Sequence, residues 1–301
     1  MITNLDQIVT RVKEKGAKRL SVACGEDPHT IEAVFKAVKE GVVTASLTGN
    51  KESILKVAEE CKVDTSFFEI EDISDKNTAL ERAVEKVASG EADFLMKGLI
   101  DSSAYIRAIL KEGKKRSSKD QIISHVSLIS LPTYHKLLVV SDIAVIPSPD
   151  LKQKIAITNY AVEIAHVLGI EKPKVSIISA VEKVQPKIQS TVDAAILSKM
   201  GDRGQIKGAI IDGPLSLDVS VSKESTKIKG VESEVAGDAD ILIFPNIETG
   251  NVFFKTCTQL ASGDVGAILT GAFCPCILTS RSDSEVSKFY SIALGALMAN
   301  G

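Results

Sequence analysis

Short runs of β-branched and apolar residues alternate with longer amphipathic stretches along most of the chain, and this alternation limits the possible folds more than any other feature. Strands are predicted over residues 19–24, 42–49, 66–70, 93–98, 174–180, 207–214, 239–245 and 265–271. Helical periodicity fills most gaps, as in residues 30–41 and 78–90, each of which ends on a glycine. The alternation predicts an α/β fold with mainly parallel sheets, helices on both faces, and ligand-binding loops at the carboxyl ends of the strands.

Residues 122–150 break this alternation, because three apolar runs follow one another with only turn residues between them. No helix longer than about a turn fits there, so antiparallel strands and a crossing between two domains are predicted. A chain of 301 residues is long enough for two domains of ordinary size. We expect a discontinuous first α/β domain, residues 1–130 with about 278–301, and a second α/β domain, residues 131–277.

The composition excludes several classes of protein. Hydrophobic residues at 44%, charged residues at 25% and a net charge of -3 are typical of a globular protein rather than a disordered or fibrous one. Lys and Arg are scattered, so no nucleic-acid footprint is predicted, and the basic run 111–119 is interpreted as a solvated loop. No apolar run has membrane-spanning length, and residues 1–16 have the pattern of an amphipathic helix rather than a targeting segment.

The five cysteines predict reduced thiols in a cytoplasmic protein, because their number is odd and most of them are far apart in the sequence. Cys274 and Cys276 are the one close pair. A zinc site needs about four ligands, and no histidine or second cysteine pair lies near them in sequence, so no metal site is predicted. Their apolar surroundings also argue against a nucleophilic cysteine, since such surroundings raise the pKa of a thiol.

A polar cluster, Thr279 to Asp283, connects an apolar run to a predicted helix that has apolar residues along one face. Ser282 and Glu285 have capping-box spacing, so a helix is expected to begin at about Asp283. Two interpretations stay open at this point. Ser282 caps the helix and Asp283 complements its dipole, or the helix start, a serine hydroxyl and Arg281 together bind a phosphate or an acyl phosphate.

Two further stretches have the same ambiguity. Residues 96–110 run from a strand through Gly98 into a loop with Ser102, and the following helix carries Arg107 one turn in. A simple helix cap with a surface arginine and an anion site are both compatible with that pattern. Residues 245–251 follow a strand and open a helix with Gly250 and Asn251.

The order of these motifs is more specific than any one of them. The chain resembles the phosphate acetyl/butyryltransferase family, and its phosphate butyryltransferase branch most closely, over about residues 90–301. The segments that carry the resemblance are SHVSLISLP, VVSDIAVIPSPDLKQKIAITNYAVEIAHVLGIEKPKVSIISAVEKV, SKMGDRGQIKGAIIDGPLSLDVSVS, KGVESEVAGDADILIFPNIETGNVFFKT and LTSRSDSEVSKFYSIALGAL.

The resemblance implies reversible transfer of an acyl group between coenzyme A and inorganic phosphate: butanoyl-CoA + phosphate = butanoyl phosphate + CoA, by direct transfer in a ternary complex. It implies a two-domain fold like that of isocitrate and isopropylmalate dehydrogenases, with the site in the interdomain cleft. A homodimer or higher homo-oligomer is expected. Coenzyme A is a substrate or product, and neither a metal nor a permanently bound cofactor is implied.

The family's C-terminal Ser-Arg pair corresponds to Ser280 and Arg281. Ser280 would donate a hydrogen bond to the charge developing on the carbonyl oxygen, and Arg281 would hold the phosphoryl oxygens. The base that takes the thiol proton is expected to be Asp283, with Glu285 as the rival. The acetyltransferase branch places its aspartate later, at the position of Ser287.

Further positions match family motifs that bind phosphate or substrate. They are Arg107, Lys97, Gly98, Ser102, Asn251 and Gly250. Asn246 replaces the aspartate that the family usually has after its proline.

Three alternatives to butanoyl transfer stay open. Acetyl-CoA is the rival substrate within the same chemistry, because a hydrophobic pocket discriminates by only about 1–3 kcal/mol per methylene. The fold would also suit an NAD-dependent dehydrogenase of the isocitrate type, although the dinucleotide-loop and metal-carboxylate motifs are missing. The third is a non-catalytic regulator that binds coenzyme A or phosphate.

Overall fold

Two compact units make up the chain. The computed structural model describes residues 1–117, 121–280 and 283–299. We call Leu5–Ile123 with Val265–Gly301 the first unit, and Met1–Asn4 with Ser124–Asp264 the second unit. The sequence predicted domain boundaries near residues 130 and 278. Whether the units fold as separate domains stays a prediction.

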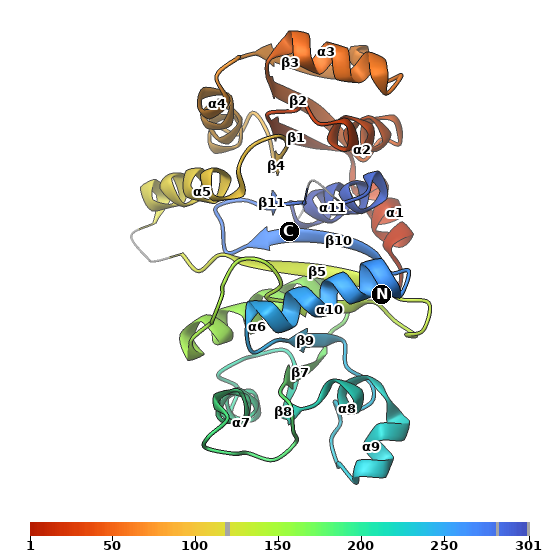
Figure 1. The fold of residues 1–301 in the computed structure, drawn as a ribbon, viewed down its shortest axis with the longest axis vertical. Helices are drawn as coiled ribbons and strands as arrows, with labels where there is room; N and C mark the ends of the chain where they lie inside the picture. The colour runs from red at the N-terminus through yellow and green to blue at the C-terminus, as the bar shows by residue number, and fades with distance from the viewer. Residues whose placement is uncertain (118–120, 281–282, 300–301) are drawn as a thin grey trace. The chain divides into compact units, whose positions relative to one another are not determined.

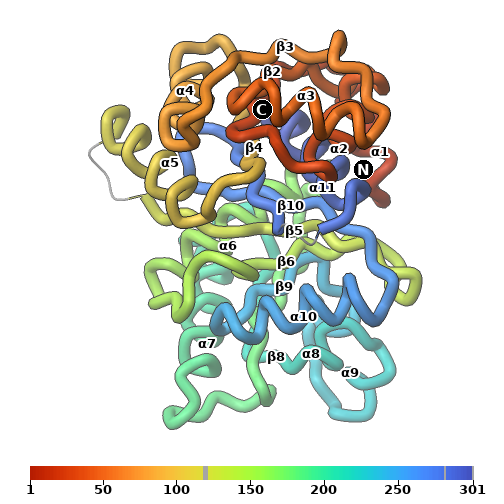
Figure 2. The backbone as a smooth tube through the Cα atoms, turned by 45° about the horizontal axis from the view of Figure 1, so that its top comes forward, coloured from red at the N-terminus to blue at the C-terminus, as the bar shows by residue number. Residues whose placement is uncertain are grey.

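The first unit is built on a sheet with the strand order β3-β2-β1-β4-β11-β10, all parallel except β10, which is antiparallel to β11. Figures 1 and 2 show α4 and α5 on one side of these strands and α2 and α11 on the other. Its elements are α1 (Leu5–Lys15), β1 (Lys18–Ala23), α2 (Pro28–Lys39), β2 (Val43–Gly49), α3 (Lys51–Glu60), η1 (Thr65–Phe67), β3 (Phe68–Asp72), α4 (Lys76–Ala88), β4 (Phe94–Lys97), α5 (Ser102–Arg116), β10 (Asp264–Thr270), β11 (Cys276–Ile277) and α11 (Glu285–Met298).

Local sequence explains where helices α2 to α5 of the first unit start. After a strand, an Asp or Asn side chain accepts a backbone N–H of the next helix, which satisfies a donor that the helix itself cannot pair. These caps are Asp27 for α2, Asn50 for α3, Asp75 for α4 and Asp101 for α5. The strands between them bury apolar side chains completely, as at Val22, Leu47, Phe94 and Met96. The loops at the carboxyl ends of these strands are therefore held by short, capped junctions.

The second unit has the strand order β5-β6-β9-β7-β8, in which only β5 and β6 are antiparallel. This confirms the antiparallel strands predicted within residues 122–150. Its elements are β5 (Ser124–Ser130), β6 (Leu138–Ser141), α6 (Leu151–Val167), β7 (Lys174–Ile178), α7 (Gln189–Asp202), β8 (Ile210–Leu215), α8 (Leu217–Val221), α9 (Lys223–Lys229), β9 (Ile241–Ile243) and α10 (Ile247–Leu260).

Two parts of the first unit differ from expectation. β11 was not predicted, because a two-residue strand has no periodicity to detect. The basic run 111–119 was interpreted as a loop, which is wrong for residues 111–116, since α5 continues to Arg116. Basic side chains suit the negative carboxyl end of a helix dipole. Gly113 leaves room there for Gln121, whose Oε1 would lie 2.0 Å from a Cβ at that position.

Candidate active site

Three strands of the first unit bring five of the predicted site residues to the carboxyl-end edge of the sheet. β1, β4 and β11 run parallel, with Ala23 beside Lys97 and Ile277 beside Met96. The loops that follow these strands are therefore neighbours, which is where ligand sites form in parallel sheets. Of the predicted residues, this edge carries Lys97, Gly98, Ser102, Ser280 and Asp283.

Lys97 and Gly98 close the end of β4 against β1. Lys97 is buried, and its ammonium donates to the carbonyl oxygens of Gly98 at 3.2 Å and Ile100 at 3.1 Å. A Cβ on residue 98 would lie 2.1 Å from the carbonyl oxygen of Cys24, so only glycine fits there. The glycine of this motif is thus explained by the close approach of two backbones, and its predicted contact with substrate stays a prediction.

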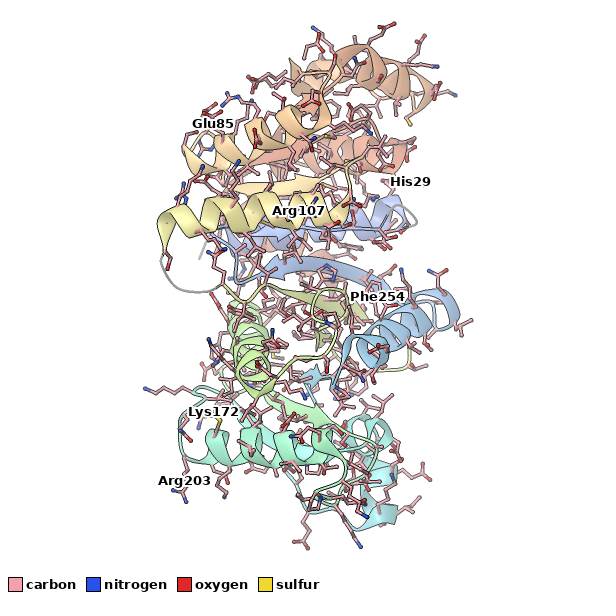
Figure 3. The ribbon with its side chains drawn as sticks, turned by 60° about the vertical axis from the view of Figure 1, so that its left-hand side comes forward. His29, Glu85, Arg107, Lys172, Arg203 and Phe254 are labelled. Atoms are coloured by element: carbon pink, nitrogen blue, oxygen red, sulfur yellow. The ribbon has the colours of Figure 1, made fainter. Side chains whose placement is uncertain are left out.

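The start of α5 has the capped form that was one of the two open interpretations. The Asp101 carboxylate accepts the N–H groups of Ser103 at 2.9 Å and Ala104 at 3.1 Å, and its hydrogen bond from the Ser103 side chain lowers the pKa of Asp101. Ser102 is the exposed first residue of the helix. Arg107 follows on the same helix and is also exposed (Figure 3).

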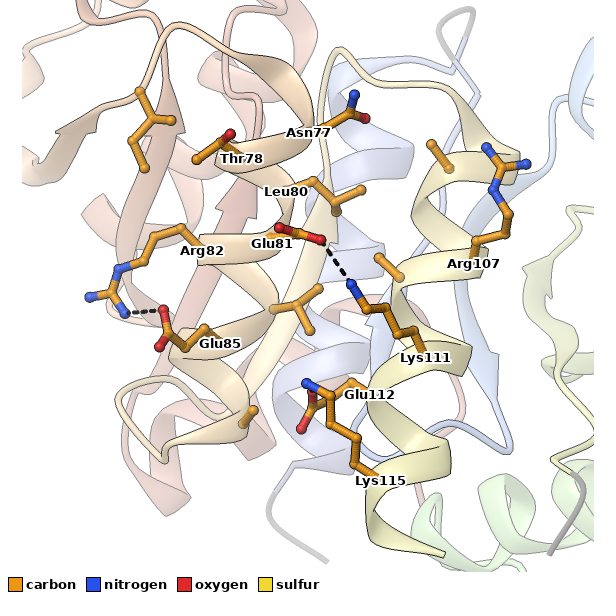
Figure 4. A pocket seen from close by; sticks show the side chains of 15 residues that line it. Asn77, Thr78, Leu80, Glu81, Arg82, Glu85, Arg107, Lys111, Glu112 and Lys115 are labelled. Carbon is orange, nitrogen blue, oxygen red and sulfur yellow. Dashed lines mark hydrogen bonds and ion pairs between the residues drawn. The ribbon is translucent and has the colours of Figure 1, made fainter. Parts of the chain in front are cut away.

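Arg107 lies at the rim of a groove of about 770 Å³ between α4 and α5. Figure 4 shows Glu81 and Lys111 pointing toward one another across this groove, with Arg107 farther along α5, nearer its start. The ammonium of Lys111 lies 3.0 Å from Glu81 Oε1. Lys111 is therefore paired with Glu81 across the groove.

The loop after β11 holds Ser280 and Asp283 together. The Asp283 carboxylate accepts the Ser280 backbone N–H at 2.7 Å, and the Asp283 N–H donates to the Ser280 carbonyl oxygen at 3.2 Å. Ser280 is exposed and Asp283 is half-buried. Arg281, predicted to hold phosphate, lies outside the described residues.

Helix α11 begins later than the sequence indicated. Its first residue is Glu285, and the N-cap is Ser284, whose Oγ accepts the Ser287 N–H at 3.2 Å. The expected start at about Asp283 is therefore wrong by two residues. Ser282, the predicted cap, lies outside the described residues. Asp283 is consequently part of the loop that carries Ser280.

Lys288, which no sequence motif singled out, lies beneath this loop. Lys288 is 2% exposed, and its ammonium donates to Thr279 Oγ1 at 3.2 Å and to the Ser280 carbonyl oxygen at 3.1 Å. The Asp27 carboxylate, at the start of α2, lies 3.8 Å away. Burial lowers the pKa of Lys288, and the carboxylates of Asp27 and Asp283 oppose that shift. The available signal was a lysine one turn into a largely apolar helix.

Gly250 and Asn251 lie in the second unit, inside α10 rather than in a turn before it. A Cβ on residue 250 would lie 2.2 Å from the Asp142 carbonyl oxygen. The Asn251 side-chain amide donates to the Ile143 carbonyl oxygen at 3.0 Å. Both residues thus hold α10 against the loop after β6, and their predicted role in substrate binding stays a prediction.

The cysteine pair lies in the first unit. Cys274 and Cys276 have their sulfur atoms 3.5 Å apart, and burial raises the pKa of Cys276 well above its ordinary value. A thiol of raised pKa is a poor nucleophile near neutral pH. Among residues 1–117, 121–280 and 283–299, no cluster of three or more His, Cys, Asp or Glu side chains could hold a metal ion, and no helix could span a membrane.

Solved structures with this fold include a branched-chain phosphotransacylase from Enterococcus faecalis. It matches with a TM-score of 0.82 and 31% identity, covering 94% of this chain and 99% of that one. The 4-hydroxythreonine-4-phosphate dehydrogenase of Klebsiella pneumoniae matches with a TM-score of 0.55 and 11% identity, covering 94% of this chain and 100% of that one, and so shows the fold alone. These likenesses confirm the predicted α/β fold with mainly parallel strands, like that of isocitrate and isopropylmalate dehydrogenases.

Sequence comparisons lead to the same group of proteins. A phosphate butyryltransferase from Clostridium acetobutylicum is 45% identical, over 99% of this chain and 99% of its own length. A phosphate acetyltransferase from Thermotoga maritima is 42% identical, over 98% of this chain and 99% of its own length. The family described as phosphate acetyl/butaryl transferase matches residues 76–296. The chain therefore belongs to the phosphate acetyl/butaryl transferase family, and it is a phosphate acyltransferase that uses coenzyme A as a substrate.

Proposed function

We propose that this enzyme is a phosphate butyryltransferase, which converts butanoyl-CoA, or a branched short acyl-CoA, and phosphate into the acyl phosphate and CoA. The observation that carries the proposal is the 45% identity to the Clostridium acetobutylicum phosphate butyryltransferase over nearly the whole length of both chains. The likeness to a branched-chain phosphotransacylase supports the same choice. Transfer is direct, within a ternary complex, and a homodimer or higher homo-oligomer is expected.

The chemistry requires two kinds of assistance. In the direction of acyl-CoA synthesis, the thiol of CoA loses its proton, sulfur attacks the carbonyl carbon, and the bond from that carbon to the phosphate oxygen breaks. Ser280 donates a hydrogen bond to the carbonyl oxygen as its negative charge grows, and Arg281 and Arg107 bind the phosphoryl oxygens. Lys97, Gly98, Ser102, Gly250 and Asn251 complete the proposed set of residues that bind phosphate or substrate.

Asp283 is the proposed base that takes the thiol proton. Its carboxylate lies next to Ser280, because it accepts the Ser280 N–H at 2.7 Å. The rival, Glu285, has its Oε1 3.9 Å from the ammonium of Lys36 on α2. The contacts therefore favour Asp283. In the reverse reaction the same carboxyl group returns a proton to the leaving sulfur.

Thiol release from acetyl-, propionyl-, butanoyl- and isobutanoyl-CoA, with and without phosphate, tests the proposal. We expect phosphate-dependent release that is fastest with the four-carbon chains. Asp283→Asn should lower kcat by about 100-fold or more, as expected for loss of a general base. Glu285→Gln is the matched control and should stay within about twofold, since removal of a partly exposed charge away from the reacting groups seldom costs more than about 0.5 kcal/mol.

Each other outcome changes one part of the proposal. Loss of activity in Glu285→Gln, with Asp283→Asn unimpaired, would assign the base to Glu285. Absence of phosphate-dependent release with all four acyl chains would contradict the proposed reaction.

A second candidate function is phosphate acetyltransferase. The 42% identity to the Thermotoga maritima phosphate acetyltransferase, over nearly the whole of both chains, favours it almost as strongly. The same four substrates separate the two candidates, because a higher kcat/KM for acetyl-CoA than for butanoyl-CoA would select the acetyltransferase.

A further inference from the structure

Lys288 is the buried charge closest to the proposed catalytic loop. It lies on α11, while the two oxygen atoms that accept from its ammonium, Thr279 Oγ1 and the Ser280 carbonyl, belong to the loop after β11. An ammonium has three donors, so one group can hold both the side chain and the backbone of this short segment. The segment is thereby tied to the helix that follows it.

Stability alone does not account for a lysine at this position. Its side chain is 2% exposed, and the nearest carboxylate oxygen, on Asp27, lies 3.8 Å away. Burying a charge is costly unless it is closely paired, and apolar residues of similar volume often replace buried ion pairs at no cost. Burial lowers the pKa of Lys288, which is the sign of that cost. A function for the charge offers a reason for the choice of residue.

A second buried lysine of the same unit provides a comparison. Lys86 on α4 is 4% exposed, and its ammonium lies 3.2 Å from Glu71 and 3.6 Å from Glu69, both on β3. Its partners are side chains of an ordinary strand. Lys288 instead binds the polypeptide that carries the proposed carbonyl-binding serine.

We propose that Lys288 is a positioning residue for acyl transfer, whose ammonium fixes the Thr279–Ser280 segment so that the Ser280 hydroxyl meets the carbonyl oxygen of the acyl group. This inference rests on the proposed function of Ser280. A preorganised donor stabilises the transition state without reorganising during the reaction, and a loosened loop would lose that advantage. Lys288 acts through Ser280 and does not itself touch the substrate.

The test measures kcat and KM of phosphate-dependent thiol release for Lys288→Met, Lys288→Arg and the matched control Lys86→Met. We expect Lys288→Met to lower kcat about 10- to 100-fold, less than or equal to removal of an oxyanion donor, with KM for both substrates within about twofold. Lys288→Arg should recover part of that loss, since it keeps the charge. Lys86→Met should keep kcat within about twofold, even if its melting temperature falls as much as that of Lys288→Met.

A double-mutant cycle with Ser280→Ala separates positioning from general stability. Because Lys288 acts through the Ser280 hydroxyl, Lys288→Met should lower kcat less than about threefold in the Ser280→Ala background. Equal losses in the two backgrounds would overturn the inference, as would unchanged kcat in Lys288→Met. Failure of the wild type to release thiol in a phosphate-dependent manner would instead contradict the proposed function.

Thr279→Val is the second route if Lys288→Met does not fold. It removes the Oγ1 acceptor and keeps the shape of a side chain that is 6% exposed. We expect a smaller loss of kcat, about three- to tenfold, because one of the two hydrogen bonds of the ammonium is lost. Full kcat in this variant would also overturn the inference.

Discussion

In each unit, buried charged side chains lie under the loops that follow the strands, and these charges have opposite signs in the two units. Predicted site residues fall in both units. In the first unit, Lys97 and Lys288 are buried beneath the loops after β4 and β11, and both donate to backbone carbonyl oxygens. In the second unit, Asp142 is buried after β6, and its carboxylate accepts the N–H groups of Ala144 at 2.7 Å and Val145 at 3.0 Å. The fully buried charges are thus cations under one group of loops and an anion under the other, while the carboxylates of the first group, Asp101 and Asp283, are exposed or half-buried.

This contrast in charge indicates which group of loops suits an anionic substrate. Backbone N–H groups and buried cations attract phosphate, whereas a buried carboxylate that already accepts the local N–H groups repels it. The loop after β6 has used its amides on Asp142, with Ser124 Oγ donating at 3.1 Å as well. We therefore expect the phosphoryl group to bind mainly to the first unit, while the loop after β6 supports α10.

The largest expected effect is on the stability of the second unit. Asp142→Ala leaves several buried donors without an acceptor, each worth about 1–3 kcal/mol, so we expect a loss of about 3–5 kcal/mol in urea unfolding. Asp218→Ala is the matched control in the same unit. Its carboxylate is half-exposed and paired with Lys229, so a loss below about 1 kcal/mol is expected. Similar losses in both variants would contradict this expectation, since the buried Asp142 carboxylate would then contribute no more to stability than an exposed one.

The next effect concerns phosphate and the first unit. Arg107→Ala should raise KM for phosphate about tenfold, as expected for loss of a charged hydrogen-bond donor, with a smaller change in KM for acyl-CoA. Lys111→Ala, on the same helix but paired with Glu81, should change KM for phosphate by less than about twofold. An equal rise in both variants would indicate a diffuse positive field rather than a specific arginine contact.

The smallest effect is the pH dependence of the buried cation. Burial lowers the pKa of Lys288 below its ordinary value of 10.5. Between the folded and the unfolded pKa, the unfolded chain binds more protons, so stability from this group rises with pH. The carboxylates that face it are those of Asp27 and Asp283, and the Thr279 hydroxyl also accepts from its ammonium.

Urea unfolding of wild type and Lys288→Met from about pH 7 to about pH 10 measures this effect. The free energy of unfolding of the wild type, relative to that of Lys288→Met, should increase with rising pH, by at most about 1.4 kcal/mol per pH unit. If this difference in unfolding free energy stays constant or decreases with rising pH, the charged form of Lys288 is not destabilised by burial in the folded state.

The sequence predicted the architecture well because the fold depends on local patterns. Alternating strands and helices, with Asp or Asn caps such as Asp75 after the strands, were visible without tertiary information. β11 was missed because its two residues carry no period, and it forms only because β4 and β10 offer it partners on both sides. The end of α5 was missed because a run of basic residues is typical of a solvated loop. The same residues also suit the carboxyl end of a helix, where they interact with the helix dipole.

The candidate site was predictable only in part, and for a different reason. Ser280, Asp283 and Arg107 belong to recognisable sequence motifs. The proposed role of Lys288 depends instead on groups that are its neighbours only in the folded structure. One of these is Asp27, which is far away along the chain and 3.8 Å away in space. Gly98 could be recognised as part of a motif, but the physical reason for the glycine required the folded sheet, because a Cβ on residue 98 would lie 2.1 Å from the Cys24 carbonyl oxygen.

The return of the chain to the first unit also determines when the proposed catalytic loop can be assembled during synthesis. A ribosome delivers β4 long before β11, and the whole of Ser124–Asp264 is made in between. Until Cys276 and Ile277 emerge, one side of β4 lacks its neighbour and its backbone groups are open to other strands. The loop with Ser280 and the lysine beneath it come after that, so nascent chains that have already formed most of the fold still lack this part of the proposed site.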